Sequence, residues 1–227
     1  MKNMEKNLNR VRSRIIEAAR ASGRDPDSIL LLAVSKKKPA SDIRLAYASG
    51  QRDFGENYLQ EAQQKMQELQ DLDICWHFIG AIQSNKTRPI AEAFDWVHCV
   101  DRAKIAHRLS EQRPVGRQPL NVCIQVNLDH ESSKAGIDPE AVPALAMEIR
   151  DLPGIRLRGL MAIPAPRDTL EEQRIPFARL AGILSLLRQQ GIDCDTLSMG
   201  MTQDLEAAVA EGSTLVRIGT AIFGERS

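Results

Sequence analysis

The sequence predicts a single (β/α)8 TIM barrel of the α/β class, on three observations. The chain has 227 residues, a length typical of one α/β barrel domain. Short apolar or β-favouring runs alternate with stretches of helical spacing eight times along the chain. No linker rich in Pro, Gly or Ser divides it. We therefore expect one domain over residues 1–227, with an open doubly wound sheet as the structural alternative.

An extra helix is expected at the N-terminus, before the first strand. Leu8, Val11, Ile15 and Ala18 recur at helical spacing among charged neighbours. This pattern predicts an amphipathic helix that packs on the outside of the core.

The first strand is expected at Ile29–Ser35, whose apolar run ILLLAV suits a strand covered by helices on both faces. Further strands are predicted near Arg52–Phe54, Cys75–Ile79, Trp96–Val100, Val122–Asn127, Arg158–Ala162, Thr196–Ser198 and Leu215–Arg217. Helices are predicted between them, near Ala40–Ser49, Glu56–Gln70, Asn85–Phe94, Arg102–Gln112, Pro139–Arg150, Thr169–Gln190 and Asp204–Glu211. Pro143 leaves one helix start open between Asp138 and Val142. The prolines of Ile163–Asp168 predict a stiff loop at the rim.

Charge and hydropathy exclude several classes of protein. Thirty Lys and Arg balance thirty Asp and Glu, so the basic surplus typical of proteins that bind nucleic acid or anionic membranes is missing. The N-terminus lacks the apolar core of a signal peptide, and no run of about 18 apolar residues occurs. We expect a cytoplasmic protein that binds neither nucleic acid nor membrane. No helix face has an excess of apolar residues, which favours a monomer.

The cysteines predict neither disulfides nor a metal site. Cys75, Cys99, Cys123 and Cys194 lie far apart, without a CxxC pair and without a Cys/His cluster at the spacing of zinc ligands. Buried free thiols are the expectation.

Lys36 is the most informative residue for function, because active sites of such barrels lie on the loops that follow the strands. It directly follows an apolar strand and adjoins Lys37 and Lys38. Partial desolvation and neighbouring cations both lower the pKa of an amine, which favours the neutral form that attacks a carbonyl. A solvated lysine cluster is the alternative. Only one of the three lysines can point inward.

The loops after the last two strands predict a phosphate site. They supply Gly200, Thr202, Gly219 and Thr220, and phosphate sites in such barrels are commonly built there from backbone N–H groups and hydroxyls. The turn at Gly219 is expected to open a short final helix. A phosphate site opposite a Schiff-base lysine suggests a ligand with both an aldehyde and a phosphate, and pyridoxal 5′-phosphate (PLP) fits that description.

Two further strand residues have open assignments. Arg217 either faces the pyridine nitrogen of such a ligand or pairs with a carboxylate such as Glu211. His77 either lines the pocket or is hydrogen-bonded inside the barrel. Three methionines near strand ends are expected to pack in the core or the pocket: Met161, Met199 and Met201.

The chain resembles the pyridoxal phosphate homeostasis proteins, which are single-domain relatives of the barrel domain of alanine racemase. The motifs on which the resemblance rests are spread over nearly the whole chain. They are LLAVSK at Leu31–Lys36, FGENY at Phe54–Tyr58, WHFIGAIQSNK at Trp76–Lys86, SSKAGI at Ser132–Ile137, RGLMAIPAP at Arg158–Pro166, LSMGMTQDLEAAVAEGST at Leu197–Thr214 and VRIGTAIFGER at Val216–Arg226. The resemblance implies a fold-type III PLP-binding barrel.

The resemblance also implies roles for residues. Lys36 would form the internal aldimine with PLP, Arg217 would face the pyridine nitrogen, and Gly219 and Thr220 would hold the phosphate. Thr202 stands where the family usually has serine; it keeps the hydroxyl but adds a methyl group. The resemblance also implies that Asn57 lines the pocket and that Lys86 and Lys134 are secondary lysines for cofactor exchange. Met201 and His77, from their places in the sequence, complete the expected cofactor-binding set.

The function implied is reversible binding of PLP in intracellular vitamin B6 homeostasis, with buffering or delivery to PLP-dependent apoenzymes and no catalytic turnover. The alternative is a small PLP-dependent racemase, which needs a second base such as Tyr58 or His77. The chain ends at Ser227, directly after the barrel, so the domain that supplies the second base in alanine racemase is not expected. A third possibility is a phosphosugar aldolase or isomerase, with Glu56 as its acid/base.

Overall fold

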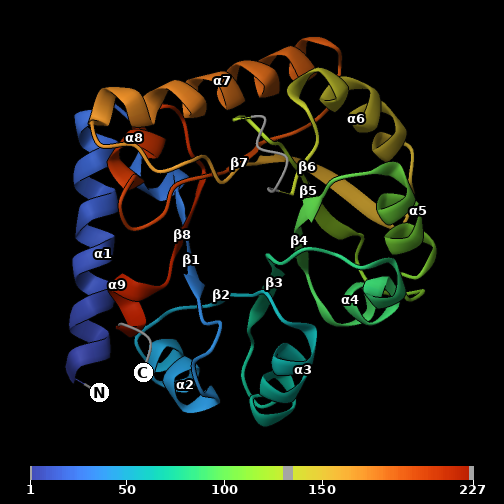
Figure 1. Cartoon of the computed structure of the whole chain (residues 1–227). Helices are drawn as coiled ribbons and strands as arrows, with labels where there is room; N and C mark the ends of the chain where they lie inside the picture. The colour runs from blue at the N-terminus through green and yellow to red at the C-terminus, as the bar shows by residue number, and fades with distance from the viewer. Residues whose placement is uncertain (1, 130–134, 225–227) are drawn as a thin grey trace.

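The structure is a computed structural model that describes residues 2–129 and 135–224 (Figure 1). Eight parallel strands close into a barrel in chain order, and β1 pairs with both β2 and β8. The closed sheet confirms the (β/α)8 barrel and excludes the open doubly wound alternative. The strands are β1 Leu30–Val34, β2 Asp53–Glu56, β3 Cys75–Phe78, β4 Trp96–Val100, β5 Leu120–Gln125, β6 Ile155–Met161, β7 Thr196–Ser198 and β8 Leu215–Ile218.

Helices surround the barrel and cover its outer face (Figure 1). They are α1 Lys2–Ala21, α2 Ala40–Ala48, α3 Leu59–Glu68, α4 Thr87–Ala93, α5 Ala103–Glu111, α6 Val142–Arg150, α7 Leu170–Gln189, α8 Leu205–Ala210 and α9 Thr220–Phe223, with short 3-10 turns η1 Pro26–Ser28, η2 Ser84–Lys86 and η3 Pro139–Ala141. In the described ranges no helix is both long and apolar enough to cross a bilayer.

The N-terminal helix α1 lies where the sequence predicts, on the outside of the barrel. It packs against α2, α8 and α9, so it joins the two ends of the chain. Leu8, Val11 and Ile15 are buried in that contact, because they share one face of the helix.

The first residues of helices α7 and α6 are set by capping and proline residues nearby in the sequence. Thr169 caps α7 through a capping box with Glu172, in which each side chain bonds the other residue's backbone N–H. The two starts left open around Pro143 are both used: a 3-10 turn begins at Pro139, directly after Asp138, and α6 begins at Val142. Pro143 is tolerated because it lies in the first turn of α6.

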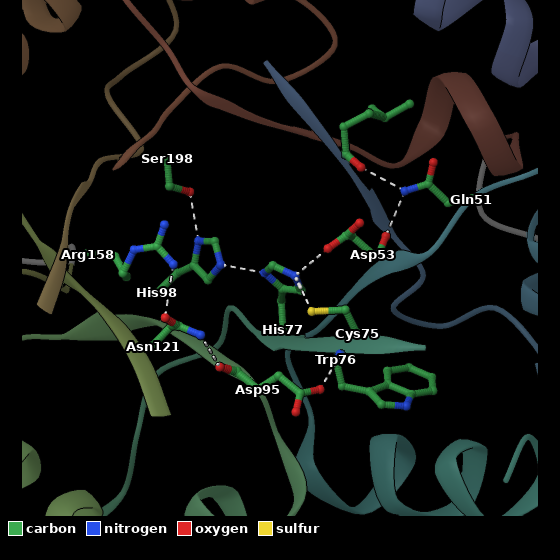
Figure 2. Close-up of polar contacts among 11 residues, drawn as sticks. Gln51, Asp53, Cys75, Trp76, His77, Asp95, His98, Asn121, Arg158 and Ser198 are labelled. Atoms are coloured by element: carbon green, nitrogen blue, oxygen red, sulfur yellow. Dashed lines mark hydrogen bonds and ion pairs between the residues drawn. The ribbon is translucent and has the colours of Figure 1, made fainter. Parts of the chain in front are cut away.

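Strand bounds differ from expectation where polar residues or glycine interrupt the apolar pattern. β2 runs to Glu56 rather than ending at Phe54, and β5 and β6 begin at Leu120 and Ile155, earlier than expected. Inside the barrel, Asn121 of β5 accepts a hydrogen bond from Arg158 of β6 (Figure 2). Such interiors are usually filled by branched apolar residues.

Candidate functional site

A cavity of about 430 Å³ opens at the carboxyl ends of the strands. This volume lies within the range of small-ligand pockets, roughly 300–1,000 Å³. Its wall comes from both ends of the chain, with contributions from β1, the β2–α3 loop, β6 and its loop, the β7–α8 loop, and β8 with the start of α9.

Lys36 lines the cavity, and its two neighbouring lysines do not. The backbone turns sharply after β1: Lys38 N donates to Ser35 O over 3.0 Å, and Lys37 has a φ of 60°. Lys37 is exposed, and its backbone N–H donates to Glu61 Oε1 over 2.5 Å. The expectation that one of the three lysines points inward is confirmed, and the strained turn is what separates them.

Asn57 borders the cavity on the β2 side, and its Oδ1 is a buried acceptor without a hydrogen-bond partner among the described atoms. Gly80 fixes the backbone there, because a Cβ at position 80 would lie 2.2 Å from Asn57 O. An unpaired buried acceptor carries a desolvation cost. A ligand donor in the cavity would remove that cost.

The β7–α8 and β8–α9 loops lie beside β1, because β8 pairs with β1, so they do not face Lys36 from the opposite side of the mouth as expected. Thr202, Gly219 and Thr220 all line the cavity, and Gly219 directly precedes the predicted short helix, α9. A Cβ at Gly219 would lie 3.2 Å from Val34 O, and Gly200 has a φ of 95°. The loops therefore approach closely because glycine occupies these two positions.

Arg14 of α1 holds this wall from outside. Its guanidinium donates to Thr202 O over 3.1 Å and to both carboxylate oxygens of Glu206 on α8. Sequence reasoning missed Arg14, which is one of many arginines on an exposed helix face.

Arg217 is buried at the end of β8 and lines the cavity floor. Its guanidinium donates to Ser198 Oγ over 2.8 Å and to Ala162 O over 2.9 Å. Burial lowers the pKa of Arg217 to about 10, so the side chain is still a cation at neutral pH. Pairing with Glu211 is wrong: Glu211 Oε1 accepts from Arg174 Nε over 2.6 Å.

The loop Ile163–Asp168 forms part of the rim, as its prolines predict, and residues 163–167 line the cavity. Asp129 fixes it by accepting from Ala165 N over 2.6 Å and from Arg167 Nη2 over 2.7 Å. Asp129 escaped the sequence analysis, although its place just after a strand was a usable signal.

His77 does not line the cavity, which corrects its assignment to the cofactor-binding set. It is buried inside the barrel, and its Nδ1 lies 2.9 Å from His98 Nε2. His98 Nδ1 lies 2.8 Å from Ser198 Oγ, the group that also bonds Arg217. A polar chain therefore runs through the barrel from His77 to the cavity floor (Figure 2).

His98 is the neutral member of that chain. Burial, followed by the neighbouring His77 and Arg217, holds the pKa of His98 well below its usual range. A neutral imidazole donates from one ring nitrogen and accepts at the other, which matches its two partners.

The remaining candidates divide between the cavity wall and other parts of the molecule. Met161 and Met201 line the cavity, whereas Met199 is buried in the core. Lys86 ends η2 and is not part of the cavity wall, and Lys134 lies outside the described residues.

Like His77, the other two acid/base groups expected for the alternative functions, Glu56 and Tyr58, do not line the cavity. Glu56 points to the outside of the barrel, where its Oε1 accepts from Lys65 Nζ over 2.7 Å and from Ser35 Oγ over 2.6 Å. Burial raises the pKa of Glu56, and Lys65 opposes that shift. Tyr58 is 57% exposed on the surface. Glu56, the carboxylate expected to act as acid/base in the aldolase or isomerase alternative, therefore lies outside the cavity.

The fold and the site together define the class. The family model for the alanine racemase N-terminal domain matches residues 2–227, and the chain belongs to that family. Two alanine racemases share the fold at 19% and 16% identity with TM-scores of 0.69 and 0.77, and the chain covers 61% and 57% of them.

Within that class, the chain belongs to the pyridoxal phosphate homeostasis protein family. It is 61% identical to the protein of that name from Pseudomonas aeruginosa over 226 residues, covering 100% of this chain and 97% of the relative. Identity to the Escherichia coli protein is 51% over 229 residues, with 100% and 98% covered. The structure of PipY from Synechococcus elongatus with PLP bound matches with a TM-score of 0.86 at 41% identity, covering 97% of this chain and 100% of PipY.

Proposed function

We propose that this protein binds PLP reversibly in the barrel-mouth cavity and acts in intracellular vitamin B6 homeostasis. One observation carries the proposal: an amine, a buried guanidinium and two glycine-containing loops line a single 430 Å³ cavity. These groups match the aldehyde, the pyridine ring and the phosphate of PLP. The PLP-bound structure of PipY, a relative that matches over 97% of this chain, supports the assignment.

Each end of the ligand has a partner in this arrangement. Lys36 Nζ condenses with the aldehyde, and the carbonyl oxygen leaves as water. Gly219 and Thr220 hold the phosphate with Thr202, whose hydroxyl replaces the usual serine. The unpaired Asn57 Oδ1 accepts a hydrogen bond from the ligand.

A carrier is favoured over a catalyst. Bound PLP supplies an electron sink, but Arg217 keeps its proton at neutral pH and so leaves the pyridine nitrogen unprotonated, which weakens that sink. Racemisation also needs two acid/base groups. Asp204 is the one carboxylate among the described residues of the wall, and its Oδ1 already accepts from Met201 N over 2.6 Å.

The absorption spectrum tests the proposal. Purified protein with added PLP should show a yellow Schiff-base band that Lys36→Ala abolishes. Lys37→Ala is the matched control, since it removes the adjacent amine outside the cavity, and it should keep the band. A band that survives in Lys36→Ala, or no uptake of PLP by the parent, would contradict the assignment.

Carrier and racemase are separated by hydrogen exchange. A carrier should release no α-deuteron from labelled amino acids beyond the Lys36→Ala background. Saturable exchange that depends on Lys36 would support the racemase instead.

For delivery, we propose that the protein is a monomer that transfers PLP to apoenzymes. Protein loaded with PLP should reactivate an apoenzyme faster than the same concentration of free PLP.

A further inference from the structure

We propose that Asp53, Cys75 and His77 form a binding site for one divalent metal ion of the zinc class, at the amino-terminal end of the barrel and away from the PLP cavity. Asp53 begins β2, Cys75 begins β3, and His77 follows two residues later on the same strand. Adjacent strands thus bring together one oxygen, one sulfur and one nitrogen ligand (Figure 2). None of the three lines the PLP cavity.

The ligand atoms have the spacing of a zinc coordination sphere. His77 Nε2 lies 3.1 Å from Asp53 Oδ1 and 3.4 Å from Cys75 Sγ, and all three atoms lie within 4.8 Å of one another. Tetrahedral zinc with ordinary bond lengths places nitrogen roughly 3.3 Å from oxygen and roughly 3.5 Å from sulfur. The side chains therefore need only small shifts to bind an ion.

The ring of His77 is held as a metal-binding histidine usually is. Its Nδ1 contacts His98 Nε2 at 2.9 Å, and its plane stacks on Trp96 with an angle of 7° and centroids 5.4 Å apart. When Nδ1 donates its proton to His98, the Nε2 lone pair faces Asp53 and Cys75. A second-shell acceptor of this kind fixes the tautomer that a metal needs.

The local charge favours a cation. The carboxylates of Asp53, Asp95 and Asp73 place negative charge around the Cys75 thiol. A divalent ion that binds there stabilises the Cys75 thiolate, and the thiol proton leaves to solvent.

Access and coordination number fit an exchangeable site. The Asp53 side chain is 20% exposed and Cys75 is half-buried, whereas His77 is fully buried. An ion can therefore enter from the barrel end. Three protein ligands leave the fourth tetrahedral position to water.

This cluster has no local signal in the sequence. Its residues form no closely spaced pair such as CxxC, because Asp53 comes from the preceding strand, 24 residues before His77. Parallel pairing aligns Asp53 directly with Cys75. Cys75 is a free thiol, but it is half-buried rather than buried as expected, and its Sγ lies 3.4 Å from His77 Nε2.

Metal titration of the full-length protein tests the proposal. Calorimetry with Zn²⁺ should give one site per chain, and Co²⁺ should add a thiolate charge-transfer band with intense tetrahedral d–d bands. Cys75→Ser should remove the charge-transfer band. Cys75→Ser, Asp53→Asn and His77→Gln should each weaken Zn²⁺ binding by more than the roughly 10- to 100-fold typical of second-shell changes. If His77→Gln does not fold, the partly exposed Asp53 still provides the test.

Two matched controls exclude incidental binding. Cys194→Ser removes a free thiol whose neighbours Arg188 and Asp193 lie outside the cluster, and His107→Gln removes an exposed imidazole beside Glu148. Both should keep wild-type Zn²⁺ affinity. Lys36→Ala should keep it too, so that metal binding is judged independently of PLP binding.

The proposal is overturned if no stoichiometric uptake occurs, or if uptake is unchanged in Cys75→Ser and Asp53→Asn. Loss of the site in either control variant would also overturn it, because binding would then lie elsewhere. An octahedral Co²⁺ spectrum without a sulfur band would exclude the three-ligand site.

Discussion

At the scale of single residues, the cavity and the barrel interior depend on polar groups whose partners are few and specific. Asn57 has a buried oxygen without a described partner, and His98 has a partner on each ring nitrogen. A change at Asn57 should therefore affect ligand binding more than folding, whereas a change at His98 should affect the stability of the fold.

Asn57→Ala should weaken PLP binding with little cost to the cofactor-free protein. The variant removes an acceptor for which the described residues offer no donor, so the complex loses one hydrogen bond of about 0.5–1.5 kcal/mol. This loss corresponds to roughly a 2- to 13-fold rise in the Kd for PLP. Fluorescence titration with PLP and urea unfolding measure the two effects. Unchanged affinity would show that Asn57 Oδ1 does not contact the ligand.

His98 should make stability fall on acidification. Its pKa in the folded protein lies well below 6.5, so below about pH 6.5 the unfolded chain binds a proton that the folded protein does not. The free energy of unfolding then falls by at most about 1.4 kcal/mol per pH unit from this group. Urea unfolding at successive pH values should show a shallower decline in His98→Gln than in the wild type.

His107→Gln is the control for that measurement, because His107 is exposed. It should retain the wild-type decline. Parallel curves for the wild type and His98→Gln would assign the decline to other groups.

At the scale of elements, close backbone approaches position the residues around the cavity. The β2–α3 and β3–η2 loops touch at Gly80 and Asn57, where space for a Cβ is lacking. The Lys37 turn and the Gly219 turn similarly bring β1 and β8 to the same cavity wall.

Gly80→Ala should destabilise the protein and weaken PLP binding together. The new Cβ would lie 2.2 Å from Asn57 O, so the backbone of one loop must move, at a cost typical of overpacking, about 1–3 kcal/mol. Thermal unfolding and PLP titration test both effects.

Gly182→Ala is the matched control for Gly80→Ala. Position 182 lies within α7 with nothing within 4 Å of the added Cβ, and alanine favours helix by about 1 kcal/mol over glycine. This variant should be more stable than the wild type and bind PLP normally. Destabilisation by both variants would point to a general intolerance of added methyl groups.

At the scale of the whole molecule, the two ends of the chain meet. Helix α1 packs along α8 and α9, and Arg14 joins it to the β7–α8 loop at Thr202 and Glu206 (Figure 1). The extra N-terminal helix therefore supports the wall that we assign to phosphate.

Arg14→Ala should raise the Kd for PLP more than it lowers stability. The Arg14–Glu206 pair is partly exposed, and such pairs contribute less than about 1 kcal/mol, whereas the loop at Thr202 loses an external support. Arg44→Ala removes a similar pair with Asp71, remote from the cavity wall, and should leave the Kd unchanged. Equal Kd values for the two variants would contradict a role for α1 in ligand binding.

Most of the architecture was predictable because its signals are local. Apolar runs indicate the strands, and capping and proline chemistry indicate where α6 and α7 begin. The candidate pocket residues followed from the rule that barrel loops after strands carry function. Lys36, Thr202, Gly219 and Thr220 were identified in this way and Asn57 through the family resemblance, and all five line one cavity.

The sequence by itself determined the order of the strands and helices and the residues that follow the strands toward the cavity, because apolar runs and turn chemistry are local signals. Only the tertiary structure decided what lies beneath that cavity. His98 and Ser198 are 100 residues apart and meet inside the barrel, and Asp53 reaches His77 through strand pairing. Closure of the sheet turns alternate side chains of distant strands toward one axis, and no local pattern encodes which polar groups meet there.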